Sequence, residues 1–235
     1  ERLRDTLSAN VETTMRLTSR RREMELLDQV LARILRHNIR NDLTIIQGFA
    51  KEIQKNEDGE TARQAGRIID RCKSLQSTAE HATEIRHIVT NRDRREQLSL
   101  PDIVERVVTA ARNEYPSARI TTNVESGADV VVHPDLPVAL RHLIENGIEH
   151  NSAESPEVHV SVSQTPDGVI LEVADDGPGI PDHEIDVLDQ HGESALEHGS
   201  GAGLWIVDRV ADYSDGNLSF ESSSTGTVAR IRFET

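Results

Sequence analysis

The sequence has little cysteine, few aromatic residues and no long apolar run, and each absence excludes a class of protein. Cys72 is the only cysteine, so an intramolecular disulfide and a metal site built from clustered cysteines are both excluded. No apolar run approaches the roughly 18 residues that a membrane-spanning helix needs. No charged-then-apolar leader of the signal-peptide kind is present either. We therefore expect a segment that has no membrane contact of its own and that works in a reducing compartment, the cytoplasm.

The composition also limits the size and make-up of the core. The chain has 235 residues, which allows one large domain or two small ones. Aromatic residues make up 3% and hydrophobic residues 36%, so Leu, Ile and Val must form most of the packing. The first residue is Glu1 rather than Met, so we expect a piece of a longer protein. The sequence does not exclude a membrane anchor or a sensor domain upstream of this piece.

The negative charge of the chain is concentrated in its C-terminal part. The formal net charge is −15. Residues 1–96 carry 19 Lys and Arg against 16 Asp and Glu, a net of +3, whereas residues 97–235 carry 7 against 25, a net of −18. This shift predicts a domain boundary near residue 97. Nucleic acid is not expected as a partner, because the acidic part would repel it.

Lysine is scarce among the basic residues. Only three of the 26 are lysines, namely Lys51, Lys55 and Lys73. A surface rich in Asp and Glu and poor in Lys is typical of a halophilic protein, which works in concentrated salt that screens self-repulsion. An ordinary acidic cytosolic protein is the alternative interpretation.

The N-terminal part has the pattern of a helical hairpin. Residues 2–55 contain no proline and only one glycine, and their apolar positions recur at helical spacing. A turn-like segment at residues 56–59 separates them from a second helical stretch at residues 60–96. A single hairpin cannot cover its own apolar stripe, so we expect two chains to form a four-helix bundle, a homodimer.

The C-terminal part alternates helical and strand patterns. We expect helices at residues 100–112 and 135–151 and from the 199–203 segment to residue 212. We expect strands at residues 119–124, 130–132, 157–164, 169–175, 217–221 and 226–233. These elements predict an α/β sandwich, a mixed sheet with helices on one face. The predicted division is therefore a hairpin over residues 1–96 and an α/β domain over residues 97–235.

One histidine stands apart from the apolar stripe of the first helix. With a step of about 100° per residue, Ile46, Phe49 and Ile53 fall within about 40° of Leu35. His37 falls about 160° away, so we expect it to point into solvent on a rigid support. Asn41 lies one turn further on the same side, within reach of any reaction at His37. An exposed helical histidine is most often only a solvated residue.

Two glycine-rich segments lie in the acidic part. Residues 175–180 follow a predicted strand directly, and residues 199–204 open a predicted helix. Glycines allow the backbone to approach a ligand closely, and a helix N-terminus offers N–H groups to phosphates. No Gly-Lys-Ser/Thr follows, so the pattern is not a P-loop, and no βαβ unit surrounds it as in a dinucleotide-binding fold. Two ordinary turns are the alternative interpretation.

Together, four segments resemble the catalytic core of a sensor histidine kinase of the two-component system. In chain order, residues 35–43, 142–151, 175–180 and 199–204 resemble the H box, the N box and two glycine boxes. Sequence details such as Arg36-His37-Asn38 look most similar to kinases of halophilic archaea. The resemblance implies a dimeric helical hairpin followed by an ATP-binding sandwich of the histidine-kinase type.

The resemblance implies a role for each matching position. Asp175 would accept the adenine amino group, and Asn146 would hold Mg²⁺ against the phosphates of ATP. The remaining glycine-box positions would contact the nucleotide, with residues 183–200 as a mobile lid; they are Gly177, Gly179, Gly199, Gly201, Gly203 and Leu204.

The resemblance implies catalytic roles for three residues of the H box. His37 would take the phosphoryl group from Mg-ATP and pass it to an aspartate in the receiver domain of a response regulator. Asn41 would orient water if the protein also dephosphorylates the regulator. Asn38 stands where the family has an acid, and an amide can orient the ring but cannot act as a general base.

Two further departures lie in the N box, where His142 replaces an Asn and Glu149 replaces a Lys.

The leading hypothesis is an ATP-dependent protein-histidine kinase. The alternative is a degenerate kinase that serves as a dimeric scaffold binding ATP or a partner, and Asn38 keeps it open. An ATPase of the same superfamily, such as a chaperone or mismatch-repair protein, would not need an exposed histidine on a dimer hairpin.

Overall fold

The computed structural model describes residues 38–181, residue 185 and residues 201–234. The described chain packs as two compact units, one up to Thr83 and the other from Glu84 onward. Each is described here by itself. The domain boundary expected near residue 97 rests on composition and stays a prediction.

The first unit is a helical hairpin. A helix over residues 38–56 is followed by α2 (Gly59–Thr90), whose part up to Thr83 belongs to this unit. Gly59 has a φ of 66°, in the left-handed region, which lets the chain turn between the helices. Small or medium-sized apolar side chains are buried along the pair, namely Leu43, Ala50, Ala65, Ile69 and Cys72. The hairpin is confirmed for the described residues, while residues 2–37 of the predicted first helix lie outside them.

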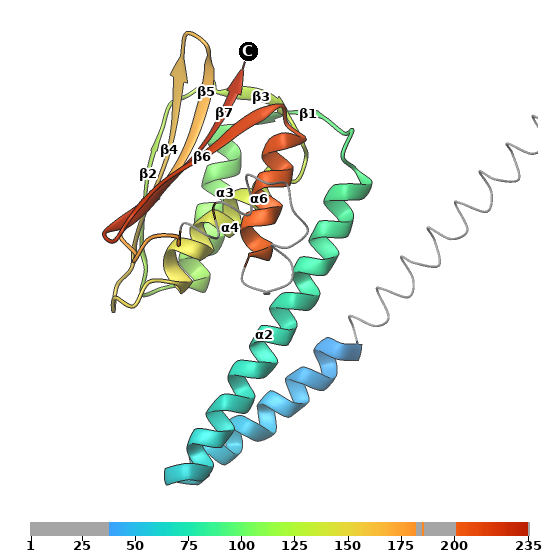
Figure 1. The fold of residues 1–235 in the computed structure, drawn as a ribbon, viewed down its shortest axis with the longest axis vertical. Helices are drawn as coiled ribbons and strands as arrows, with labels where there is room; N and C mark the ends of the chain where they lie inside the picture. Colours follow the sequence, from blue (N-terminus) through green and yellow to red (C-terminus); the bar gives the residue numbers. More distant parts are fainter. Residues whose placement is uncertain (1–37, 182–184, 186–200, 235) are drawn as a thin grey trace, which may run out of the picture. The chain divides into compact units, whose positions relative to one another are not determined.

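The second unit contains a five-stranded mixed sheet (Figure 1). Its strand order is β2-β4-β5-β7-β6; β2 and β4 are parallel and the other pairs antiparallel. The strands are β2 (Arg119–Val124), β4 (Glu157–Thr165), β5 (Gly168–Asp175), β6 (Gly216–Ser223) and β7 (Gly226–Glu234). A second, two-stranded antiparallel sheet pairs β1 (Glu96–Ser99) with β3 (Asp129–Val132).

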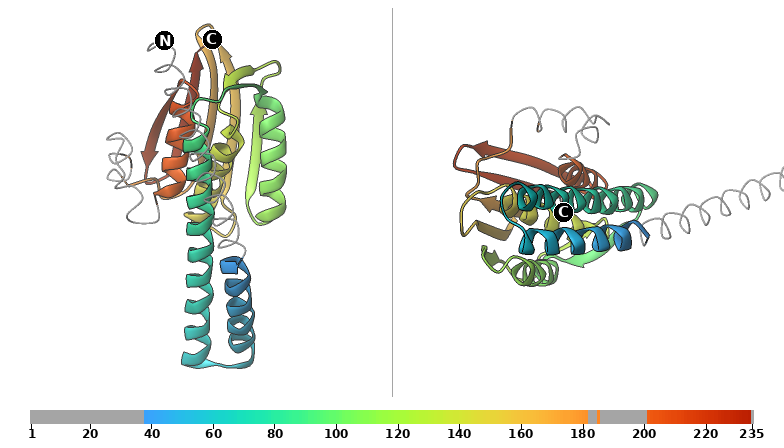
Figure 2. Two further views of the ribbon diagram at one scale, coloured as in Figure 1. Left: turned by 90° about the vertical axis from the view of Figure 1, so that its right-hand side faces the viewer. Right: turned by 90° about the horizontal axis from the view of Figure 1, so that it is seen from below.

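Three helices cover one face of the five-stranded sheet, as Figure 2 shows. They are α3 (Leu100–Glu114), α4 (Leu136–Glu149) and α6 (Ala202–Asp212). Alternate residues of the central strands point toward these helices and are buried, for example Val158, Val160 and Val162 in β4. The core between sheet and helices is almost wholly aliphatic, as the composition requires. The predicted α/β sandwich is confirmed.

The segment that joins hairpin and sandwich differs from the prediction. The expected helix over residues 60–96 ends at Thr90, and strand β1 at Glu96–Ser99 follows where the sequence predicts no strand. Ser99 then caps α3, because its Oγ accepts a hydrogen bond from the N–H of Asp102 at 3.4 Å, and Pro101 occupies the first turn. The four residues of β1 carry no local signal strong enough to reveal their pairing with the distant β3.

Candidate nucleotide-binding site

A cavity of about 250 Å³ opens where α4, the end of β5 and the start of α6 meet. Apolar side chains form much of its wall, including Leu143, Val173, Leu204 and Phe220. Polar groups enter it from Asn146, His150, Asn151, Asp175 and Thr227. A mostly apolar pocket with a few converging polar groups is typical of a small-molecule site.

Asp175, the last residue of β5, is the half-buried acid of this cavity. Its Oδ1 accepts hydrogen bonds from the backbone N–H of Gly177 at 2.8 Å and of Thr227 at 3.3 Å. Burial raises the pKa of Asp175 above its usual value, and the N–H groups of Gly177 and Thr227 oppose that rise. Because both bonds converge on Oδ1, the carboxyl group is held in one orientation at the cavity wall.

The first glycine segment forms the rim beside Asp175. Gly179 has a φ of 84°, and a Cβ atom there would overlap the carbonyl oxygen of Ser223. Ser222 fixes the same turn, because its Oγ accepts from the N–H of Ile180 at 2.7 Å. Glycine is therefore required for this close packing against the end of β6.

The second glycine segment begins α6. Gly201 is the N-cap, and its carbonyl oxygen accepts from the N–H of Trp205 at 2.9 Å. A Cβ atom on Gly203 would lie 3.4 Å from Nδ1 of His142 and 3.7 Å from Oδ1 of Asn146. The N-terminus of α6, which favours anions, thus lies directly against the N-box face of α4.

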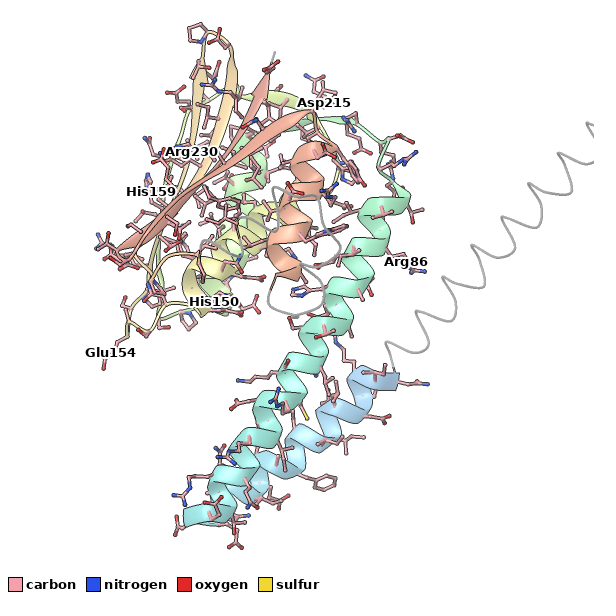
Figure 3. The ribbon with its side chains drawn as sticks, viewed as in Figure 1. Arg86, His150, Glu154, His159, Asp215 and Arg230 are labelled. Atoms are coloured by element: carbon pink, nitrogen blue, oxygen red, sulfur yellow. The ribbon has the colours of Figure 1, made fainter. Side chains whose placement is uncertain are left out.

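The end of α4 brings the side chain of His150 to the cavity, while the side chain of Glu149 is held by Tyr115. Glu149 is held away by Tyr115, whose OH donates to Glu149 Oε1 at 2.7 Å. The next residue, His150, is exposed and lines the cavity, and it is labelled in Figure 3. Among the described lining residues, His150 is the one whose side chain can carry positive charge.

The structure brings together most of the predicted nucleotide-site residues. Asn146, Asp175, Gly177, Gly179 and Leu204 all line the cavity. Gly201 and Gly203 lie beside it, in the first turn of α6. Gly199 and most of the expected lid, residues 183–200, lie outside the described residues.

The H-box residues belong to the other unit. Asn38 and Asn41 are both exposed on the helix of residues 38–56, and the helical spacing predicts this exposure for Asn41. His37 lies outside the described residues.

The sequence did not predict two of the lining residues, Thr227 and His150. Thr227 is buried, and it reaches Asp175 only because β7 pairs with β5. His150 follows Glu149 in the N box, and its position became informative only when Tyr115 was found to hold Glu149 away. The signal that could have found His150 is the replacement of a lysine by an acid in the preceding position.

Comparisons with known proteins agree with this fold and pocket. Residues 131–235 match the family described as histidine kinase-, DNA gyrase B-, and HSP90-like ATPase. This part of the chain is therefore similar to the ATPase domains of that family, and ATP is the nucleotide that the similarity implies.

Curated proteins that are similar to the chain include kinases. Sporulation kinase B of Bacillus subtilis (strain 168) is 24% identical over 214 residues, 86% of this chain and 48% of that protein. Sensor-type histidine kinase PrrB of Mycobacterium leprae (strain TN) is 26% identical over 213 residues, 83% of this chain and 45% of that protein. The chain spans about half the length of these curated relatives.

Solved structures show the same fold. Full-length ShkA, in complex with AMPPNP, superposes with a TM-score of 0.57 at 18% identity, over 87% of this chain and 46% of that one. None of the helices that the structure describes has the length and apolar character needed to cross a membrane.

Proposed function

We propose that the chain is the core of a sensor histidine kinase that phosphorylates His37 from Mg-ATP and passes the phosphoryl group to a response-regulator aspartate. The observation that carries the proposal is the cavity beside Asp175, which lies within the domain that matches the ATPase family. The kinase relatives, which align with the hairpin as well as the sandwich, support the same function.

Asp175 gives the cavity its base specificity in this proposal. Oδ1 is already occupied by two N–H donors, so Oδ2 accepts the adenine amino group. Leu143 and Phe220 offer apolar surface to the planar ring. A carboxylate in a partly buried site discriminates well, because a ligand without the matching donor would leave it unpaired.

The phosphates lie toward the N-terminus of α6 and His150. This part of the chain is strongly acidic, with a net charge of −18 over residues 97–235, so local attraction is needed to hold a polyanion. The amide groups at the start of α6 and the imidazole of His150 supply it.

Asn146 is suited to hold Mg²⁺. Its side chain is half-buried, lines the cavity and has its Oδ1 beside the start of α6. An amide oxygen is a suitable ligand for this hard cation, which takes its other ligands from phosphates and water. Mg²⁺ held there would offset the negative charge of the phosphates.

At the phosphoacceptor, a ring nitrogen of His37 bonds to the γ-phosphorus while the bond to the β–γ bridging oxygen breaks and ADP leaves. The imidazole must be neutral to attack, which histidine allows near pH 7. Asn38 orients the ring without taking its proton. General-base help is typically worth about 100- to 10,000-fold, so its loss slows the transfer without preventing it. Asn41 orients water for dephosphorylation of the regulator.

The hairpin forms a homodimer in this proposal. Seven of the nine exposed large apolar side chains among the described residues lie in the first unit: Ile39, Ile45, Ile46, Phe49, Ile53, Ile68 and Leu75. Leu43 and Ala50, which lie beside the predicted stripe, are buried within the hairpin, whereas Ile46 and Phe49 in the stripe are 45% and 64% exposed. A second hairpin would cover them.

The acidic surface suits a halophilic protein. The charge of the second domain and the presence of only three lysines support this proposal. The melting temperature should then rise from about 0.1 M to molar KCl, because salt screens self-repulsion. A melting temperature that stays constant over this range would contradict it.

Incubation with γ-labelled ATP and Mg²⁺ tests the kinase proposal. A kinase acquires a label that is lost in acid and kept in base. The alternative is a degenerate kinase that serves only as a scaffold, which the replacement of the usual acid by Asn38 allows. It predicts ATP binding without any label.

A further inference from the structure

Glu84, on the last part of α2, contacts two consecutive side chains of α4. Glu84 Oε1 accepts a hydrogen bond from a terminal nitrogen of Arg141 at 2.6 Å. Glu84 Oε2 lies 2.7 Å from Nε2 of His142. Glu84 belongs to the second compact unit, and so do Ile85 and Ile88, which anchor this end of α2 in the core.

The two partners of Glu84 are themselves held by Glu145, one turn further along α4. The other terminal nitrogen of Arg141 donates to both carboxylate oxygens of Glu145, at 2.9 and 2.8 Å. Nδ1 of His142 lies 3.7 Å from Glu145 Oε2. The His142 side chain is only 3% exposed, so its ring is fixed between two carboxylates with little access for water.

Nε2 of the His142 ring points to Glu84, whereas Nδ1 lies near the start of α6, at the candidate phosphate region. A Cβ atom on Gly203 would lie within 3.4 Å of His142 Nδ1 and within 3.7 Å of Asn146 Oδ1. His142 and Asn146 are also one turn apart on α4. A shift of the His142 ring would therefore move either the start of α6 or Asn146.

We propose that Glu84 is a positioning residue for the nucleotide site. Through His142 it holds Asn146 and the first turn of α6 in the arrangement that binds Mg-ATP. This inference rests on the proposed function. It extends the site to a residue of α2, outside residues 131–235, which match the ATPase family.

The position of the contact predicts which part of nucleotide binding depends on Glu84. His142 lies beside Asn146 and Gly203, whereas the adenine side of the cavity is formed around Asp175 and its N–H donors. Loss of Glu84 should therefore weaken binding that needs Mg²⁺ and phosphate contacts and should leave Mg²⁺-free binding nearly unchanged. A contact that only stabilises the fold would change both to the same extent.

The test is titration of the full chain with a fluorescent ATP analogue, in Mg²⁺ and in EDTA, for wild type and Glu84→Gln. We expect the Kd in Mg²⁺ to rise about tenfold, because the variant loses one partner of a half-buried charged hydrogen bond. The Kd in EDTA should stay within about twofold. Glu84→Asp is a second variant that keeps the negative charge. Its Kd in Mg²⁺ should lie between the values for wild type and Glu84→Gln, and it provides the test if Glu84→Gln does not fold.

Two controls sharpen the result. Glu80 lies one turn earlier on α2 and pairs with Arg40, so Glu80→Gln removes a similar charge and should leave both Kd values unchanged. His142→Phe should weaken Mg-ATP binding, and adding Glu84→Gln to it should weaken that binding little further, because both changes remove the contact between Glu84 and His142.

The inference is overturned if Glu84→Gln binds the analogue like wild type in Mg²⁺, or if both Kd values rise equally. Failure of wild type to bind in either buffer overturns the proposed function and this inference with it. The two failures are therefore distinguishable.

Discussion

Gly147 of α4 lies against Asp175 at the end of β5, so close that a Cβ atom on Gly147 would be 2.8 Å from Cβ of Asp175. The methyl group would also lie 3.2 Å from Cγ2 of Val158. This contact links the N box directly to the acid of the nucleotide pocket. The orientation of Asp175 therefore depends on the absence of a side chain at position 147.

Gly147→Ala should displace Asp175 and weaken ATP binding. Overpacking of this kind costs about 1–3 kcal/mol, and we expect part of that cost to appear in nucleotide affinity. Titration with a fluorescent ATP analogue, together with thermal melting, measures both effects. Gly48→Ala is the matched control, because nothing lies within 4 Å of its added methyl group, and it should leave nucleotide affinity unchanged. Wild-type affinity in Gly147→Ala would contradict the packing argument.

Asp175→Asn should weaken ATP binding and stabilise the unliganded protein. The amide can still accept from Gly177 and Thr227 through its oxygen, but its NH₂ group then faces the adenine amino group. A mismatch of two donors costs roughly 1–3 kcal/mol of binding. A fluorescent ATP analogue measures this loss, and unchanged affinity would show that Asp175 is not the adenine acceptor.

The stability effect of the same variant depends on pH. Burial raises the pKa of Asp175 in the folded protein above its ordinary 3.8, so the folded state binds the proton more tightly than the unfolded state. Ionisation of Asp175 therefore lowers the free energy of unfolding as pH rises through the folded pKa. Asp175→Asn removes this penalty, so its advantage in urea unfolding should be present at pH 7 and should vanish near pH 3.8. A variant that is less stable than wild type at pH 7 would contradict this sign.

The sequence predicts the elements with strong local patterns and misses those defined by distant pairing. The alternating valines of β4 and β5, with a Pro166-Asp167-Gly168 turn between them, identify that hairpin directly. In contrast, β1 has four residues, and only pairing with β3 makes it a strand.

The candidate site likewise contains residues that the sequence predicts and residues that only the folded chain brings there. Asn146 and Asp175 lie in motifs that the sequence displays. Thr227 and Glu84 reach the site from β7 and α2 through contacts that only the folded chain creates. The helical periodicity correctly predicts that the apolar side chains of the first helix lie along one face. It does not reveal which apolar side chains the hairpin itself covers, and Phe49 is among those left exposed.

His133 should make the second unit sensitive to acid. Its side chain is fully buried; Nε2 lies 3.1 Å from the carbonyl oxygen of Asn91, and Nδ1 accepts from the N–H of Asp135 at 3.2 Å. These two partners suit the neutral ring with its proton on Nε2. Burial lowers the pKa of His133 below 6.5, with Arg95 and His87 adding to the effect and Asp135 opposing it.

The unfolded state therefore binds the proton more tightly than the folded state, and the free energy of unfolding should fall as pH drops below about 6.5. His133→Gln keeps a donor and an acceptor but has no charge to gain. Urea unfolding between pH 7.5 and pH 5 should show a smaller loss for this variant than for wild type. Parallel pH profiles would rule out His133 as the source of the acid sensitivity.

Phe49→Glu should convert the protein to a monomer. Phe49 is 64% exposed in the single chain, so a charge there is tolerated within the hairpin but not inside a four-helix bundle. Light scattering at micromolar concentration should give a dimer for wild type and a monomer for the variant. Val131→Glu is the control, because Val131 is equally exposed but lies in the second unit, and it should remain dimeric. A monomeric wild-type protein would refute the dimer.

The most direct test of the kinase proposal is the phosphorylation of His37→Gln with γ-labelled ATP and Mg²⁺. In the proposed mechanism, ATP binds in the second unit, whereas His37, which accepts the phosphoryl group, belongs to the N-terminal part of the chain. The variant should therefore lose all acid-labile label and still bind the fluorescent ATP analogue with wild-type affinity. Label that persists in His37→Gln, or a wild-type protein that binds ATP and acquires no label, would contradict the account.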